Sequence, residues 1–378
     1  MRILIAPDSF KGSLSSLEAA QAIRSGFARV FPEADYRLIP LADGGEGTTE
    51  AVLAAVAGNR RTLTVTGPLF DPTESFYGLV GRRVVLEMAT SAGLALVPLS
   101  KRNPLQTTTF GVGEMIKAAA SEDIDEIIVG IGGSATNDGG CGLAEALGVV
   151  FSGDRGRLSG MTGEKLELVR SIDVSGIDTA VSGLRVRVAC DVTNPLTGPE
   201  GAAAIYGPQK GATPEMVKRL DAGLANLAQV IRKDLGIDVS EQPGAGAAGG
   251  LGYGLMVFAG AELESGIDLV MESVGLAEKV KEADLVISGE GHLDSQTMSG
   301  KVLEGVGRIC REAKIPCAAL VGGVSPGLEL RSLTGIQSVE AAVASPSSVE
   351  AAMENASDWL TDAAERAARW LKLGMGLA

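Results

Sequence analysis

The stretch RILIAPDSFKGSLSSLEAAQAIRSGFARVFP, residues 2–32, predicts a buried strand, a short polar loop and an amphipathic helix in succession. Residues 3–6 are continuously apolar, as in strands that are covered on both faces. Ser15 and Glu18 form a capping-box pair at the start of the helix, whose apolar residues recur at helical spacing until a proline ends it. The loop 7–13 therefore leaves the carboxyl end of a strand, where open α/β sheets bind ligands.

Further strand-like runs follow, and each precedes a glycine or a carboxylate and then a helix-like pattern. They lie at residues 37–41, 127–131, 186–189, 285–288 and 318–321. Apolar strands that alternate with helices predict an α/β fold with a mostly parallel sheet covered on both faces. A last helix is predicted to start at the capping-box pair Ser347 and Glu350 and to run to residue 371.

The chain is expected to form two domains. Residues 62–100 alternate in polarity and turn at Pro and Gly, which predicts antiparallel strands, whereas residues 285–345 return to the pattern of the first strand. We therefore expect a discontinuous, flavodoxin- or Rossmann-like α/β domain with a parallel sheet at 1–61 and 280–378. Residues 62–279 would form an inserted α/β domain with a mixed sheet and the glycine-rich nucleotide loops.

The composition is typical of a soluble globular protein, with 45% hydrophobic and 21% charged residues. A net charge of −14 without a basic patch argues against nucleic acid as a partner. No apolar window suits a membrane span and no secretory leader is visible, so we expect a cytoplasmic protein with no membrane contact. The four cysteines form no C-x-x-C pair and are expected to be reduced and mostly buried. The oligomeric state stays open.

One stretch is unusually rich in glycine: GIGGSATNDGG, residues 130–140, has five glycines among short polar residues. Glycines let backbone N–H groups close around a phosphate, and hydroxyls add donors. The stretch matches neither G-x-x-x-x-G-K-[ST], whose lysine is missing, nor G-x-G-x-x-G. A lysine from outside the stretch would have to replace the missing one, and Lys11 is the first candidate.

Three more polar loops follow predicted strands and offer carboxylates. LADGGEGTTEA (41–51) contains Asp43, CDVTNPLTG (190–198) contains Asp191, and SGEGHLDSQTMSGK (288–301) contains Glu290, His292, Asp294 and Lys301. Plain turns would explain each loop separately, and His292 is expected to be a hydrogen-bonded loop residue. Together, the carboxylates, hydroxyls and glycines are the groups that phosphoryl transfer needs.

The run GAGAAG, residues 244–249, satisfies the dinucleotide pattern G-x-G-x-x-G, but the VSEQP before it is no strand. We interpret it as a flexible or tightly packed turn. An NAD-dependent dehydrogenase that uses this run is the alternative enzyme. A non-catalytic protein that closes on a small acid is the alternative without chemistry.

In combination and order, these motifs resemble the bacterial glycerate kinase family of the glycerate 2-kinase type. The matching blocks are ILIAPDSFKGSLSS, PLADGGEGT, GIGGSATNDGG, CDVTNPL, GAGAAGGLG and SGEGHLDSQ, and the resemblance runs to about residue 325. It implies a kinase that uses ATP and Mg²⁺ to phosphorylate D-glycerate, with 2-phosphoglycerate favoured over 3-phosphoglycerate. It also implies two α/β domains with the active site in the cleft between them.

The residues allow roles to be predicted within this resemblance. The ATP phosphates are expected at Gly132, Gly133, Ser134, Thr136 and Asn137, and Mg²⁺ is expected close to Asp138. Glycerate or the transferred phosphoryl group is expected at Lys11, Ser13, Asp43 and Gly45. Asp191 is the first candidate to accept the proton of the substrate hydroxyl, and Asp294 is the second.

Overall fold

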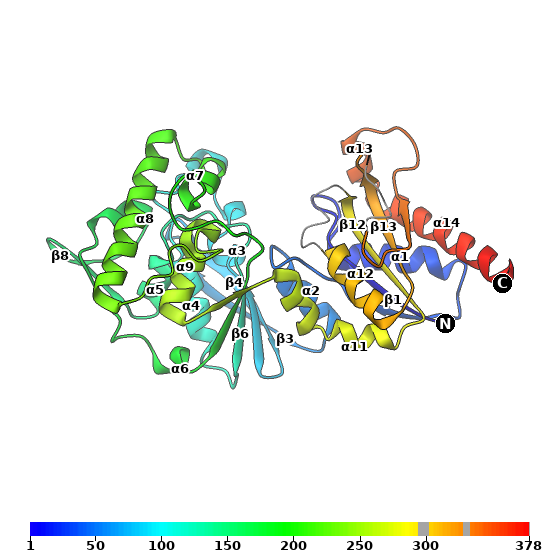
Figure 1. Ribbon diagram of the computed structural model, residues 1–378, viewed down its shortest axis with the longest axis horizontal. Coiled ribbons are helices and arrows are strands. Elements are labelled where there is room, and N and C mark those ends of the chain that lie inside the picture. The colour runs from blue at the N-terminus through cyan, green and yellow to red at the C-terminus, as the bar shows by residue number, and fades with distance from the viewer. Residues whose placement is uncertain (294–301, 328–332, 378) are drawn as a thin grey trace. The chain divides into compact units, whose positions relative to one another are not determined.

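The computed structural model describes residues 1–293, 302–327 and 333–377, and the chain divides into two compact units (Figure 1). The first unit is assembled from separate segments of the chain, Met1–Asp43, Glu50–Ala57 and Ile267–Ala378. The second unit comprises Gly44–Thr49 and Gly58–Gly266. The boundaries expected from the sequence were 62 and 280.

The first unit is built on a parallel sheet of five strands, in the order β14-β13-β12-β1-β2. The strands are β1 (Arg2–Pro7), β2 (Asp35–Leu38), β12 (Leu285–Leu293), β13 (Cys317–Val324) and β14 (Ser338–Ala341). The parallel arrangement predicted from the apolar runs is therefore confirmed. β1 and β12 run in register, with Pro7 opposite Gly289, so the loops that follow them leave the same edge of the sheet.

Helices pack on this sheet, and α1 and α14 lie side by side (Figure 1). The helices are α1 (Ser16–Ala28), α2 (Thr48–Ala55), α10 (Gly266–Ser273), α11 (Leu276–Lys281), α12 (Val302–Ala313), α13 (Val349–Glu354) and α14 (Ala356–Leu377). The predicted capping box of Ser15 and Glu18 is present at α1. Apolar side chains of α1, α14, β1 and β12 form the core of this unit.

The last helix differs from its prediction. The chain forms two helices, α13 and α14, with a break at Asn355, and Ser348 instead of Ser347 caps the first of them by accepting from the N–H of Ala351. Both serines precede the same apolar pattern, so spacing alone could not decide between them.

The second unit contains a mixed sheet of six strands, in the order β11-β10-β6-β5-β4-β3. The strands are β3 (Asn59–Thr66), β4 (Pro72–Val80), β5 (Arg83–Glu87), β6 (Glu126–Gly130), β10 (Arg185–Ala189) and β11 (Glu262–Glu264). β3, β4 and β5 are antiparallel, as residues 62–100 predicted, and the remaining pairs are parallel. A separate antiparallel sheet has the order β8-β7-β9, with β7 (Val150–Gly153), β8 (Gly156–Leu158) and β9 (Ser171–Asp173).

Helices complete the second unit and enclose two large apolar cores, one against the mixed sheet and one around α8 and β7, and a small cluster around Leu220. The helices are α3 (Ala89–Ala92), α4 (Phe110–Ala119), α5 (Cys141–Ala146), α6 (Thr179–Ser182), α7 (Ala202–Tyr206), α8 (Pro214–Leu235) and α9 (Ala247–Ala259), with 3₁₀ turns η1 (Leu94–Leu96), η2 (Leu99–Lys101), η3 (Gly163–Leu168) and η4 (Pro208–Lys210). Across the residues with assigned structure, no helix is both long and apolar enough to cross a membrane. All four cysteines are free thiols.

Candidate active site

Two glycine stretches that are far apart in the sequence meet at the carboxyl ends of β5 and β6 in the second unit. The two strands are parallel, with Glu87 opposite Gly130. A Cβ at Gly130 would lie 2.6 Å from the carbonyl oxygen of Gly44, and one at Gly132 would lie 2.8 Å from the Cα of Gly45. Because real Cβ atoms essentially never come within 3.0 Å of such atoms, only glycine allows the two backbones to touch here.

The carboxylate of Glu87 holds the shorter glycine stretch in place. Glu87 is 2% exposed and accepts hydrogen bonds from the backbone N–H groups of Gly47 at 2.9 Å and Thr49 at 2.5 Å. Both donors lie at the start of α2, where backbone N–H groups have no acceptor within the helix. Sequence reasoning missed Glu87, although a carboxylate directly after the apolar run at 84–86 was the available signal.

The longer stretch presents backbone at the surface only at its beginning. Gly132 is half-buried and Gly133, with φ of +74°, is exposed, whereas Ser134 and the residues up to 140 are buried. The first two are therefore placed where a ligand can reach their backbone. The predicted phosphate-binding set is thus divided between an accessible part and a buried part.

Thr136 and Asn137 belong to the buried part. Both are 0% exposed, and the Thr136 hydroxyl and both polar atoms of the Asn137 amide have no hydrogen-bond partner among the residues that the structure describes. Gly249 backs them in a left-handed conformation, and a Cβ there would lie 2.0 Å from the Thr136 carbonyl oxygen. The GAGAAG run is therefore a tightly packed turn at the start of α9, and α8 precedes it instead of a strand.

Asp138, which was expected near Mg²⁺, lies inside the second unit with 0% exposure. Its carboxylate accepts hydrogen bonds from the N–H and the hydroxyl of Thr109, both at 2.8 Å, and from the N–H groups of Gly140 and Gly142, both at 3.2 Å. Burial raises the pKa of this carboxyl, and the hydrogen bonds oppose the shift. Asp138 thus ties the starts of α4 and α5 to the glycine stretch, and its metal role stays a prediction.

Within the second unit, a lysine contacts the glycine stretch: Lys210. The role expected for Lys11, which belongs to the first unit, stays a prediction. Lys210 ends η4 and is 2% exposed; its Nζ donates to the Ser134 hydroxyl at 2.6 Å and to the Thr136 carbonyl oxygen at 2.7 Å. Burial lowers its pKa to about 7, and the charge of Asp138 opposes this shift. Sequence reasoning missed Lys210, although its place between two glycines in GPQKG was a weak signal.

Asp191 follows β10, whose carboxyl end lies beside those of β5 and β6 in the same sheet. Its side chain is exposed, and Oδ1 accepts a hydrogen bond of 2.8 Å from the N–H of Gly266. The bond fixes one oxygen of the carboxylate and leaves the group at the surface. In the second unit, the structure therefore brings Asp191 to the same sheet edge as both glycine stretches.

The first unit places a separate set of polar residues at the carboxyl ends of β1 and β12. Lys11 and Asp43 form an ion pair, with Nζ 3.6 Å from Oδ2. The Ser13 hydroxyl donates to the Phe10 carbonyl oxygen at 2.9 Å, so it is engaged within its own loop. Asp8 and Glu290 are buried beside them, at 9% and 5% exposure.

Asp8 is the unusual member of this set; the sequence placed it in the expected ligand loop 7–13 but gave it no role. Burial raises the pKa of Asp8 to about 7, the charges of Asp43 and Glu290 add to the shift, and the Ser9 N–H and Lys11 oppose it. A carboxyl that titrates near neutrality at the end of a strand is characteristic of functional sites. Its position in PDSFKGS, beside Lys11, was the available signal.

Two of the predicted residues, Asp294 and Lys301, lie outside the described residues. His292 is exposed, and its Nε2 shares a hydrogen bond of 2.9 Å with the Ser325 hydroxyl, as expected for a loop histidine. Within the described ranges, no group of three His, Cys, Asp or Glu side chains could hold a metal ion by itself.

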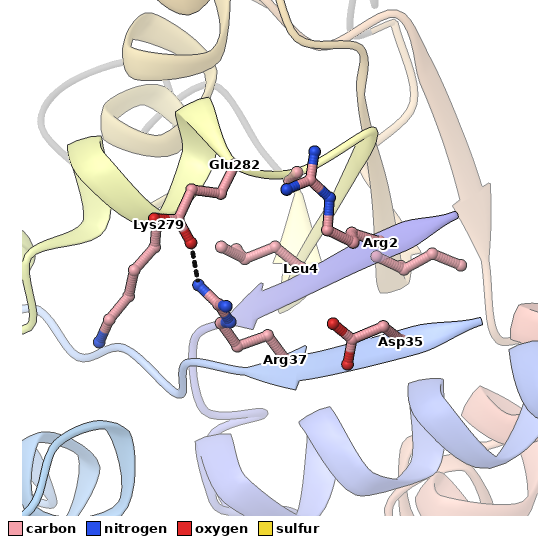
Figure 2. A pocket seen from close by; sticks show the side chains of 8 residues that line it. Arg2, Leu4, Asp35, Arg37, Lys279 and Glu282 are labelled. Atoms are coloured by element: carbon pink, nitrogen blue, oxygen red, sulfur yellow. Dashed lines mark hydrogen bonds and ion pairs between the residues drawn. The ribbon is translucent and has the colours of Figure 1, made fainter.

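A small pocket lies on the opposite edge of the first sheet (Figure 2). It is lined at the amino ends of β1 and β2 by Arg2, Ile3, Leu4, Asp35, Arg37, Lys279, Glu282 and Ala283. Arg37 and Glu282 form an ion pair of 2.6 Å in it, and Arg2 pairs with Asp284 beside it. It therefore lies away from the candidate residues of this unit, which follow the carboxyl ends of the strands.

The fold and these groups define an α/β protein whose glycine stretches lie at the carboxyl ends of parallel strands. Such stretches are suited to bind phosphate. The family model for the glycerate kinase family matches residues 3–372. A glycerate kinase from Bacillus subtilis (strain 168) is 46% identical over 99% of this chain and 98% of its own. A glycerate 2-kinase from Escherichia coli (strain K12) is 45% identical over 99% of both chains.

The structural comparison agrees. A crystal structure of a proposed glycerate kinase 2 from Salmonella typhimurium LT2 is similar with a TM-score of 0.90 and 46% identity, over 100% of this chain and 99% of the other. The chain belongs to the glycerate kinase family. It is therefore a phosphotransferase, and membership of a kinase family implies ATP as the donor and glycerate as the acceptor.

Proposed function

We propose that the protein transfers the γ-phosphoryl group of ATP to the 2-hydroxyl of D-glycerate, giving 2-phosphoglycerate and ADP. The observation that carries this proposal is the backbone contact of Gly132 with Gly45. It joins the two glycine stretches into one surface, beside the ends of three parallel strands. Phosphoryl transfer requires donors around the phosphates and groups that orient the attacking hydroxyl, with little covalent chemistry by the protein.

The phosphates of ATP bind at the accessible backbone of Gly132 and Gly133, with the Ser134 hydroxyl as a further donor. Backbone N–H groups suit this task because they are fixed before the substrate arrives and stabilise charge without reorganisation. Thr136 and Asn137 support this surface from behind, since both are fully buried.

Asp191 orients the 2-hydroxyl of glycerate and accepts its proton. Its Oδ1 is fixed by the Gly266 N–H, so the carboxylate has a defined orientation at the surface. A kinase aspartate of this kind acts largely by orienting the nucleophile. Gly45, on the adjoining backbone, allows the acceptor to approach closely because it has no side chain.

The first unit contributes Lys11, Ser13 and Asp43, which we assign to glycerate or the transferred phosphoryl group. Lys11 is 82% exposed despite its ion pair with Asp43, so its ammonium can turn from that carboxylate to a substrate anion. A lysine acts here as a mobile point charge.

ATP enters as its magnesium complex. Mg²⁺ is commonly held by one or two carboxylates together with substrate phosphates and water, and it neutralises charge on the phosphates. The described residues fit only this mode, because no set of three protein ligands is present among them and the Asp138 carboxylate is already saturated with donors. No step above depends on a ligand from Asp138.

The experiment is a product analysis. The full chain is incubated with ATP, Mg²⁺ and D-glycerate, and the product is examined by ³¹P and proton NMR, with a glycerate-free reaction as the control. We expect phosphate on the 2-hydroxyl. Phosphate on the 3-hydroxyl would contradict the proposed acceptor, and an absence of ADP above the control would contradict the reaction itself.

A further inference from the structure

Lys210 is a buried cation that contacts the candidate site, and the mechanism above does not use it. It is 2% exposed, at the end of the 3₁₀ turn η4. A lysine is rarely buried to this extent, because removing an ammonium from water costs several kcal/mol unless it has partners. Its partners are therefore informative about why it is there.

Both partners belong to the long glycine stretch. Nζ donates to the Ser134 hydroxyl at 2.6 Å and to the carbonyl oxygen of Thr136 at 2.7 Å. The two contacts bracket the turn directly after the accessible Gly132 and Gly133. One side chain thus fixes the position of the segment from 134 to 136 from the inside of the unit.

The contact also decides what the Ser134 hydroxyl can do. A hydroxyl has one hydrogen to donate and two lone pairs that accept. In its ammonium form Lys210 has no acceptor, so Ser134 accepts in this pair and its own hydrogen stays available to a phosphate oxygen. The neighbouring Thr136 and Asn137 side chains pack behind the stretch but do not fix it through hydrogen bonds, since their polar atoms have no partner in the described part of the chain.

We propose that Lys210 is a positioning residue for ATP: its contacts with Ser134 and Thr136 hold the glycine stretch in the shape that binds phosphate and direct the Ser134 hydroxyl hydrogen to the nucleotide. This inference rests on the proposed role of the stretch in ATP binding. Lys210 acts through Ser134 and the backbone and does not itself touch the substrate.

The first test is Lys210→Met, which keeps the length of the side chain and removes its donors. Misplaced binding groups weaken catalysis by about a hundredfold per ångström. We expect KM for ATP to rise at least about tenfold and kcat to fall, while KM for glycerate stays within about twofold. A merely structural lysine would lower the amount of active enzyme and leave both KM values unchanged, and that result would overturn the proposal.

The matched control is Lys218→Met, which removes an exposed lysine from α8 in the same unit and should leave both KM values unchanged. Lys210→Leu, which also removes the donors, repeats the test with the same criteria if Lys210→Met does not fold. Both variants are compared with the wild-type chain by thermal melting before the assay.

A double-mutant cycle with Ser134→Ala separates this inference from the function on which it rests. We expect Ser134→Ala to raise KM for ATP. KM for ATP of the double variant should be no higher than that of Lys210→Met alone, because both changes remove the same Lys210–Ser134 interaction. Fully additive effects would overturn the role of Lys210 while leaving the stretch as an ATP site. An unchanged KM for ATP in Ser134→Ala and in Lys210→Met would contradict the proposed ATP site as well.

Discussion

Gly132 and Gly45 lie backbone against backbone, so closely that a Cβ on Gly132 would be 2.8 Å from the Cα of Gly45. They come from stretches that are separated by β3, β4, β5 and β6 in the chain. Their contact explains the surplus of glycine in both stretches as a packing requirement in addition to a requirement for bare backbone near a ligand.

Replacing Glu87 by Gln should weaken the hydrogen bonds that fix the shorter glycine stretch. Glutamine offers one oxygen where the carboxylate offers two, so one of the N–H groups of Gly47 and Thr49 loses its acceptor. We expect a loss of about 1–3 kcal/mol in the free energy of unfolding. We also expect kcat/KM to fall by about a hundredfold, because the backbone of Gly45 shifts. Urea unfolding and steady-state kinetics measure the two effects.

The control for this change is Glu74→Gln, at an exposed position of β4 in the same sheet. It should change neither the free energy of unfolding nor kcat/KM. Equal kinetics of Glu87→Gln and Glu74→Gln would show that the anchored stretch has no part in turnover.

Asp8 predicts a specific dependence of stability on pH. Its pKa in the folded chain is raised to about 7 from an ordinary value of 3.8, first by burial and then by Asp43, with Glu290 adding to the shift and Ser9 and Lys11 opposing it. Between these values the folded chain keeps a proton that the unfolded chain has released, so Asp8 makes stability fall as pH rises through about 4 to 7. Each pKa unit corresponds to about 1.4 kcal/mol, which gives a total on the order of 4 kcal/mol.

The measurement compares the wild-type chain with Asp8→Asn by urea unfolding at several pH values. The variant lacks the titrating proton, so its advantage over the wild type should grow through this window and become constant above it. Parallel stability curves for the two proteins would be inconsistent with a raised pKa at Asp8.

Asp191→Asn tests the assignment of the proton acceptor. Asparagine keeps an oxygen for the Gly266 N–H, so the free energy of unfolding should change by less than about 0.5 kcal/mol. We expect kcat to fall by about 10² to 10⁴ with KM for both substrates nearly unchanged, as for an interaction made in the transition state. Asp221→Asn is the control, because Asp221 likewise accepts from a backbone N–H, that of Gly198, at 2.9 Å. Near-normal turnover of Asp191→Asn would refute the assignment.

The sequence predicted the parts of this protein that depend on local pattern. Apolar runs marked the strands of both sheets, and the pair Ser15 and Glu18 marked the start of α1 correctly. Spacing was insufficient where two residues offered the same chemistry within one position, as Ser347 and Ser348 did. The motif blocks also led to the right family, because their order along the chain is more specific than any one of them.

The missing parts of the candidate site are those that tertiary packing creates. Glu87 and Lys210 contact glycine stretches that lie 38 to 76 positions away in the chain, a relationship without any local signal. The raised pKa of Asp8 arises from burial, which a polar motif does not reveal. Conversely, the sequence suggested that the Asp138 carboxylate was available for a metal ion, whereas in the fold it accepts hydrogen bonds from Thr109, Gly140 and Gly142.

The activity of Gly132→Ala tests directly whether the two joined glycine stretches form the phosphate site. A methyl group there must push the backbone of Gly45 away, because 2.8 Å is closer than any real Cβ contact. Gly183→Ala in the same unit is the control, since its nearest neighbour would be 3.6 Å away, at the Thr179 carbonyl oxygen. We predict that Gly132→Ala folds but loses about a hundredfold in kcat/KM for ATP, whereas Gly183→Ala is normal. Full activity of Gly132→Ala would show that phosphate binding does not depend on the contact of the two stretches.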